Sequence, residues 1–172
     1  MGAERPQYIL QPVRVGWIVA SFAVSLMLNF VPWQPAALAP DFVAMTLAFW
    51  CVRQPRLVGL GAGWFMGLLN DAGSGVLLGQ HALVYALLAF GAITLSRRIL
   101  WFSVWAQALH VAVLLVLAQA IGLLVRVAAG AEFPGWSLFA APLIGAALWP
   151  ALSFVLLVPQ RRPVEVDETR PI

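Results

Sequence analysis

The sequence predicts an all-α, polytopic membrane protein with six transmembrane helices. Of its 172 residues, 62% are hydrophobic and only 10% are charged, and the mean hydropathy is +0.90. Such a chain has too little polar surface to enclose its apolar residues as a soluble domain. A helix needs about 20 apolar residues to cross the hydrocarbon layer, so the length suits six crossings joined by short loops.

Arginines occupy every second connection between the apolar blocks. Arg126 is the exception, and the remaining connections carry Asp41, Asp71 and Glu132. Because loops rich in Lys and Arg stay in the cytoplasm, we expect both termini there. The pI near 10 then reflects cytoplasmic arginines, and we expect no nucleic-acid partner. The patterned arginines are Arg5, Arg14, Arg53, Arg56, Arg97, Arg98, Arg161, Arg162 and Arg170.

We expect one transmembrane domain over residues 1–158, followed by a cytoplasmic polar tail at 159–172. The first apolar block, from Val15 to Phe30, is longer than the roughly 7 to 15 apolar residues of a secretory signal. Since Ala37-Leu38-Ala39 is followed directly by Pro40, we interpret this block as an uncleaved anchor. The expected spans are about 13–33, 37–52, 56–71, 79–96, 99–125 and 134–158.

The second and third blocks are short, because the second fits between Asp41 and Arg53 and the third is apolar only from Leu57 to Leu69. We therefore expect Asp41 and Asp71 near the outer interface, since a carboxylate at the membrane centre costs on the order of 3 kcal/mol. The fifth and sixth blocks are long and uncharged. Pro142 and Pro150 should kink the sixth helix.

A four-residue repeat of five glycines and one acid begins within the third block and continues beyond it. Residues four apart lie on nearly the same helix face, and such spacing lets helix backbones approach closely in lipid. The repeat therefore predicts either packing within the chain or a docking face for a partner helix. Its members are Gly59, Gly63, Gly67, Asp71, Gly75 and Gly79.

The segment from Asn70 to Gly75 has the composition of a turn, so we expect the third helix to end there. For Asp71 three roles are open: capping the next helix, contacting a partner, or carrying a proton. Gln80 and His81 could complete a small polar cluster around it.

Gln107 and His110 share a face of the fifth helix, with Gln119 near the same angle. This polar stripe predicts either interhelical hydrogen bonds or one wall of a substrate cavity. Candidate residues for a polar pocket are Asp41, Asn70, His81, Gln107 and His110.

Enzymatic signals are weak. Asp71, Ser74 and His81 are close in sequence, but a triad is defined by geometry. His81 and His110 lack metal-binding companions, and the single Cys51 excludes a thiolate cage. We therefore predict a protein that is not an enzyme, with no cofactor and no catalytic or metal site.

Several segments together resemble the rod shape-determining protein MreD family. The most specific is the spacing Gly67-x-x-x-Asp71-x-x-x-Gly75-x-x-x-Gly79, and Asn70 before the acid is a looser part of the resemblance. The other segments are Pro32-Trp33, Pro40-Asp41, Gly61 to Gly67, Gly75-Val76-Leu77-Leu78-Gly79, Trp105-Ala106-Gln107-Ala108-Leu109 and Leu148-Trp149-Pro150.

The resemblance implies a non-enzymatic scaffold in the bacterial inner membrane, within the cell-elongation (rod) complex that directs lateral peptidoglycan synthesis. Its direct partner would be MreC, a mainly periplasmic protein, with MreB, RodA and its transpeptidase partner in the same complex and lipid around the helices. The family is also similar in fold to the substrate-binding subunits of energy-coupling-factor transporters. The alternative function is therefore a small-molecule transport subunit, with Asp71, His81, Gln107 and His110 as ligand-binding candidates.

Overall fold

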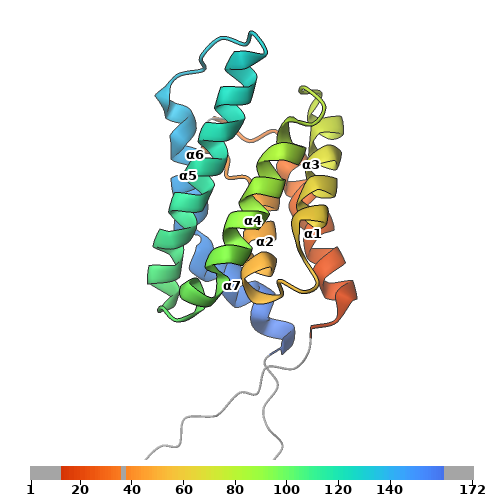
Figure 1. Cartoon of the computed structure of the whole chain (residues 1–172), viewed down its shortest axis with the longest axis vertical. Helices are drawn as coiled ribbons and strands as arrows, with labels where there is room; N and C mark the ends of the chain where they lie inside the picture. The colour runs from red at the N-terminus through yellow and green to blue at the C-terminus, as the bar shows by residue number, and fades with distance from the viewer. Residues whose placement is uncertain (1–12, 36–37, 161–172) are drawn as a thin grey trace, which may run out of the picture.

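The computed structural model describes residues 13–35 and 38–160, and over these residues the chain is built from α-helices with short 3₁₀ segments (Figure 1). This confirms the predicted all-α class. The helices are α1 (Val15–Phe30), α2 (Phe42–Arg53), α3 (Leu60–Ser74), α4 (Gln80–Leu100), α5 (Val104–Ala128), α6 (Ala140–Ala147) and α7 (Trp149–Leu157), with 3₁₀ turns η2 (Trp136–Phe139) and η3 (Val158–Gln160).

Helix α2 is the centre of the bundle. Its ten consecutive residues from Val43 to Val52 are all buried, and it contacts each of the other α-helices. Two hydrogen bonds join it to α1: Trp50 Nε1 donates to Ser21 Oγ (2.8 Å), and Ser25 Oγ lies 2.6 Å from Thr46 Oγ1. A helix that is apolar on every side belongs in a core, and α2 is enclosed in this way.

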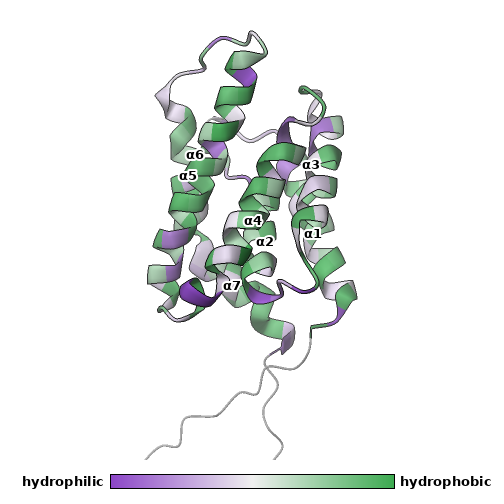
Figure 2. Ribbon diagram, in the orientation of Figure 1, coloured by the Kyte–Doolittle hydropathy of each residue, from purple (hydrophilic) through white to green (hydrophobic). Residues whose placement is uncertain are grey.

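The outward faces of the bundle are apolar (Figure 2). Met27 on α1 and Leu109 and Leu124 on α5 are each about 70% exposed. By length and composition, α4 and α5 can each cross a membrane, and the bent pair Trp136–Ala147 and Trp149–Gln160 counts as a third crossing if it is one span. The chain is a multi-pass helical membrane protein, while the six-span count stays a prediction.

The two ends of the bundle differ in their charges. The start of α1, the end of η3 and the α2–α3 and α4–α5 connections lie at one end, which we call the arginine end (Figure 1). It carries Arg53, Arg56, Arg97 and Arg98. The other connections lie at the opposite end, here called the loop end. Arg5, Arg161, Arg162, Arg170 and most of the expected tail lie outside the described residues.

The last apolar block is divided at Leu148, where α6 and α7 meet at a bend of 42°. Pro150 is the second residue of α7, and Pro142 is the third residue of α6. N–H groups in the first turn of a helix have no intrahelical acceptor, so a proline costs little there. The predicted kink is confirmed next to Pro150, which directly follows the bend. Pro142 starts the helix before the bend and is not next to it.

The predicted turn from Asn70 is wrong, because α3 continues to Ser74 and ends at Gly75, which adopts a left-handed conformation (φ 64°). Polar side chains break helices when they bond to the local backbone. Asn70 and Asp71 instead find partners on other parts of the chain, as described below, and therefore remain helical.

Candidate functional site

The glycine repeat brings α3 and α4 into backbone contact. A Cβ atom on Gly63 would lie 2.7 Å from the carbonyl oxygen of Tyr85, and one on Gly67 would overlap the backbone of Ala82. Gly59 has looser surroundings, with only Ile93 near it. Of the two alternatives for the repeat, the geometry of Gly63 and Gly67 matches packing within the chain.

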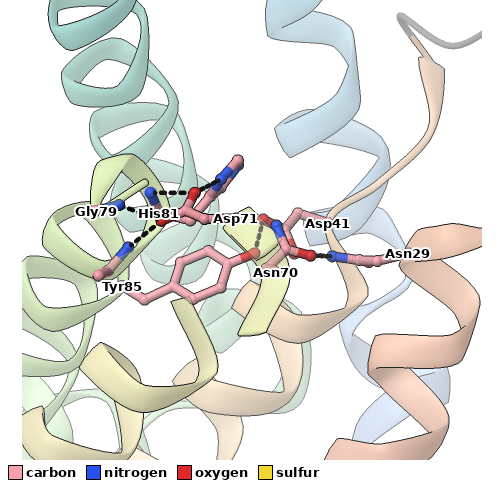
Figure 3. Close-up of polar contacts among 8 residues, drawn as sticks. Asn29, Asp41, Asn70, Asp71, Gly79, His81 and Tyr85 are labelled. Atoms are coloured by element: carbon pink, nitrogen blue, oxygen red, sulfur yellow. Dashed lines mark hydrogen bonds and ion pairs between the residues drawn. The ribbon is translucent and has the colours of Figure 1, made fainter. Parts of the chain in front are cut away.

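Asp71 caps the N-terminus of α4 from the neighbouring helix (Figure 3). Its carboxylate accepts hydrogen bonds from the backbone N–H groups of Gly79 (2.9 Å) and His81 (3.0 Å), with a longer contact to that of Ala82 (3.4 Å). His81 Nδ1 lies 2.7 Å from the Oδ1 atom of Asp71. The Asp71 side chain is fully buried, and it supplies the acceptors that the first turn of α4 lacks. These contacts match the capping alternative.

Asp41 plays a similar part at the start of α2. Its Oδ1 accepts hydrogen bonds from the backbone N–H of Ala44 and from Asn29 Nδ2, both at 2.9 Å. Its Oδ2 accepts the hydroxyl of Tyr85 at 2.6 Å. One carboxylate thus ties together α1, α2 and α4.

Asn29 joins Asp41 to Asn70, the residue that precedes Asp71 on α3. Besides its bond to Asp41, its amide nitrogen donates to Asn70 Oδ1 (3.2 Å), and its own oxygen accepts the backbone N–H of Phe42 (2.9 Å). Sequence reasoning missed Asn29 and Tyr85, although an asparagine at the end of an apolar block was a usable signal. The ring of His81, which is bonded to Asp71, lies 5.6 Å from that of Tyr85. The buried polar cluster, as these residues are called from here on, comprises Asn29, Asp41, Asn70, Asp71, His81 and Tyr85.

The buried polar cluster holds the loop that joins α3 to α4, Gly75 to Gly79. Gly75 and Gly79 have φ angles of 64° and 97°, a region that favours glycine, and Asp71 accepts the N–H of Gly79. Between them the loop exposes apolar side chains, with Leu77 57% and Leu78 71% accessible. The glycine repeat therefore has two roles: its first part allows close helix packing, and its last two glycines shape the loop.

Gln107 and His110 are not part of this arrangement. Gln107 Nε2 donates to the carbonyl of Phe102, and His110 Nδ1 bonds to the carbonyl of Ala106, near the arginine end. Both bonds stay within the segment that starts α5. The expectation of interhelical hydrogen bonds from this stripe is therefore wrong for these two residues, because local carbonyls at the helix start are closer acceptors.

A cavity of about 400 Å³ lies at the loop end between α2, α4, α5 and α6. Of the five residues predicted for a polar pocket, Asp41 and His81 line it, whereas Asn70, Gln107 and His110 do not. Its other walls include Met45, Leu115 and Leu138. The polar residues that line it are Asp41, Gln80, His81, Tyr85, Gln119, Arg126 and Ser137.

Within residues 13–35 and 38–160, no group of three or more His, Cys, Asp or Glu side chains is placed to hold a metal ion. Cys51 is buried in the core. The fold and site therefore define a class: a helical membrane protein in which buried carboxylates tie helix ends together and shape an exposed apolar loop.

Comparison with known proteins identifies the family. The family model described as rod shape-determining protein MreD matches residues 12–158. The chain is 27% identical over 155 residues to the rod shape-determining protein MreD of Haemophilus influenzae, which covers 87% of this chain and 93% of that protein. No solved structure matches the chain. The chain belongs to the MreD family of rod shape-determining proteins.

Proposed function

We propose that this protein is a non-enzymatic scaffold of the cell-elongation complex in the bacterial inner membrane. In this proposal it crosses the membrane six times with both termini in the cytoplasm, binds MreC, and supports lateral peptidoglycan synthesis. The family match over residues 12–158 supports the role in rod shape, and the arginine end supports the orientation. MreB would act on the arginine side, and RodA with its transpeptidase partner beside the bundle.

The observation that carries a scaffold role is the exposed loop between α3 and α4. Val76, Leu77 and Leu78 are consecutive, apolar and exposed, and the α3–α4 connection that contains them is at the loop end (Figure 1). In the proposed orientation they face the compartment that holds most of MreC. Exposed apolar patches on a fixed surface mark interaction sites, so we assign the binding of MreC to this loop.

The buried polar cluster serves this function indirectly. Its carboxylates are occupied by donors from the chain itself. Asp71 positions the loop through the N–H of Gly79, and Asp41 positions the helices beside it. The same reasoning applies to Gly63, whose substitution would disturb the α3–α4 contact. A partner-binding defect in a variant of Asp71 or Gly63 would thus reflect a displaced loop.

The test is recovery of MreC with the tagged protein from native membranes in mild detergent. We expect a double Leu77→Ser, Leu78→Ser variant to retain less than about a tenth of the wild-type MreC, since a few central apolar residues dominate an interface. The matched control is Trp101→Ser with Trp105→Ser, two residues that are 91% and 74% exposed near the arginine end. Wild-type recovery with the loop variant would contradict the assignment.

A second candidate, a small-molecule transport subunit, is favoured by the cavity at the loop end. The same experiment separates the two. Recovery of paired ATPase subunits in place of elongation proteins would favour transport, and their absence beside stoichiometric MreC would favour the scaffold.

A further inference from the structure

The cavity at the loop end contains polar groups that the fold does not use. Gln80 is only 6% exposed, lines the cavity, and has no side-chain hydrogen-bond partner among the described residues. Gln119 on α5 also lines it and likewise lacks a partner in the described part of the chain. Buried amides are normally hydrogen-bonded, so Gln80 points to a missing partner, and the half-buried Gln119 lines the same cavity.

Arg126 adds a positive charge to the cavity wall. It lies on the same face of α5 as Gln119, because residues seven apart are two turns apart, and both line the cavity. No carboxylate among the described residues pairs with Arg126. The cavity also contains Asp41, but its oxygens already accept bonds from Asn29, Ala44 and Tyr85. Because those donors are neutral, Asp41 keeps its negative charge, and the positive charge of Arg126 is carried separately by an exposed side chain without an acidic partner among the described residues.

The contact between α4 and α5 sets the relative depth of the polar residues in the cavity. A Cβ on Gly122 would lie 3.5 Å from Val84, so these two residues are level on the antiparallel helices α4 and α5. Gln80 is one turn from Val84 toward the loop end, and Arg126 is one turn from Gly122 in the same direction. Gln80 and Arg126 thus share a level near the mouth, and Gln119 lies about two turns deeper than Arg126.

The walls between these polar groups are apolar. Met45 from α2, Leu115 from α5 and Leu138 beside α6 all face the cavity. A volume near 400 Å³ is within the range of pockets that hold drug-sized ligands, which are mostly apolar with a few convergent polar groups.

We propose that this cavity binds a small amphiphilic anion. Its carboxylate or phosphate group pairs with Arg126 and accepts a hydrogen bond from Gln80 at the mouth. Its less polar body lies against Met45 and Leu115, with one hydrogen-bonding group near Gln119. The inference rests on the cavity alone and holds whether or not the loop binds MreC.

The anion has two sources, a phospholipid headgroup with its first acyl carbons or a soluble carboxylate. The probes are dihexanoylphosphatidylglycerol and octanoate, each added to the detergent-purified protein. Binding is measured as a rise in the thermal unfolding midpoint, followed by a thiol-reactive dye that labels Cys51 as the core opens, since this single cysteine is buried.

We expect at least one probe to raise the midpoint of the wild type by several degrees. The half-saturating concentration should rise at least tenfold in Arg126→Gln and in Gln119→Leu, because both residues contact the ligand but support no bond within the described fold. Arg97→Gln, at the arginine end, is the matched control and should bind like the wild type. The probe that acts identifies the source of the anion.

No midpoint shift with either probe would overturn the proposal, as would equal shifts in the wild type, Arg126→Gln and Gln119→Leu. The unliganded midpoints of both variants guard against misfolding and should match the wild type. MreC recovery is a separate measurement, so failure here is distinguishable from failure of the scaffold role.

Discussion

Two polar regions adjoin each other at the loop end, and they differ in where their partners lie. In the buried polar cluster, Asp41 and Asp71 each accept several hydrogen bonds from the chain. In the cavity, Gln80, Gln119 and Arg126 have no side-chain partner among the described residues. Of these three only Gln80 is buried, while Gln119 is half-buried and Arg126 is exposed. Because an unpaired buried polar group is costly, the first region indicates a structural role and the second indicates binding. The predictions below test this difference, starting with the contact that brings α3 and α4 together.

The largest effect should come from Gly67→Ala. Its Cβ would overlap the backbone of Ala82, and backbone cannot move aside as a flexible side chain can, so we expect a loss of about 3 kcal/mol or more. The measurement is the unfolding midpoint from Cys51 labelling. The control is Gly61→Ala on the same helix, where a Cβ meets nothing within 4 Å and should be neutral or stabilising. Equal midpoints for the two variants would refute the close packing.

Asp71→Ala should have the second-largest effect on stability. It leaves the N–H groups of Gly79 and His81 without their acceptor, for an expected loss of about 2 to 3 kcal/mol. MreC recovery should fall as well, because the α3–α4 loop loses its anchor. Glu132→Ala, which removes an exposed acid, is the control and should change neither quantity. A stable Asp71→Ala variant would contradict the capping role.

Tyr85→Phe should cost less, about 1 to 2 kcal/mol, because it removes one hydrogen bond to the Asp41 carboxylate while keeping the ring. The bond is 2.6 Å long and joins α4 to the start of α2. Thermal unfolding of the purified protein checks this value. Wild-type stability would mean that Asp41 does not depend on the hydroxyl.

The smallest effect should come from Gln80→Leu in the cavity. Replacing an amide that has no partner in the described structure with an apolar group of similar size should leave the midpoint unchanged or slightly raised. A clear loss of stability in the ligand-free protein would show that Gln80 has a structural partner, and the contrast between the two regions would fail.

The sequence predicted those features that depend on residues close to one another along the chain. Composition predicted helices, and the apolar block between Asp41 and Arg53 forms α2, because an aspartate caps the residues directly after it. The spacing of Gly63 and Gly67 predicted close helix contact, since the period alone places them on one face. The division near Pro150 follows from the missing N–H of proline.

The sequence was uninformative where partners are distant along the chain. Asn29 meets Asn70 across 41 positions, and nothing near either residue indicates the other. The same bond explains why the turn prediction at Asn70 is wrong, since local composition cannot foresee a tertiary partner. The predicted polar pocket included Asp41 and His81, which line the cavity, but not Arg126. The reason is related: Gln80, Gln119 and Arg126 converge only after α4 and α5 pack side by side.

The central claim is that the α3–α4 loop contacts MreC while the buried polar cluster holds it in place. The most direct measurement is photo-crosslinking in growing cells with p-benzoylphenylalanine at position 78, compared with the same residue at position 101. The account predicts a crosslink to MreC from Leu78→p-benzoylphenylalanine and none from Trp101→p-benzoylphenylalanine. A crosslink from position 101 only, or from neither position, would contradict it.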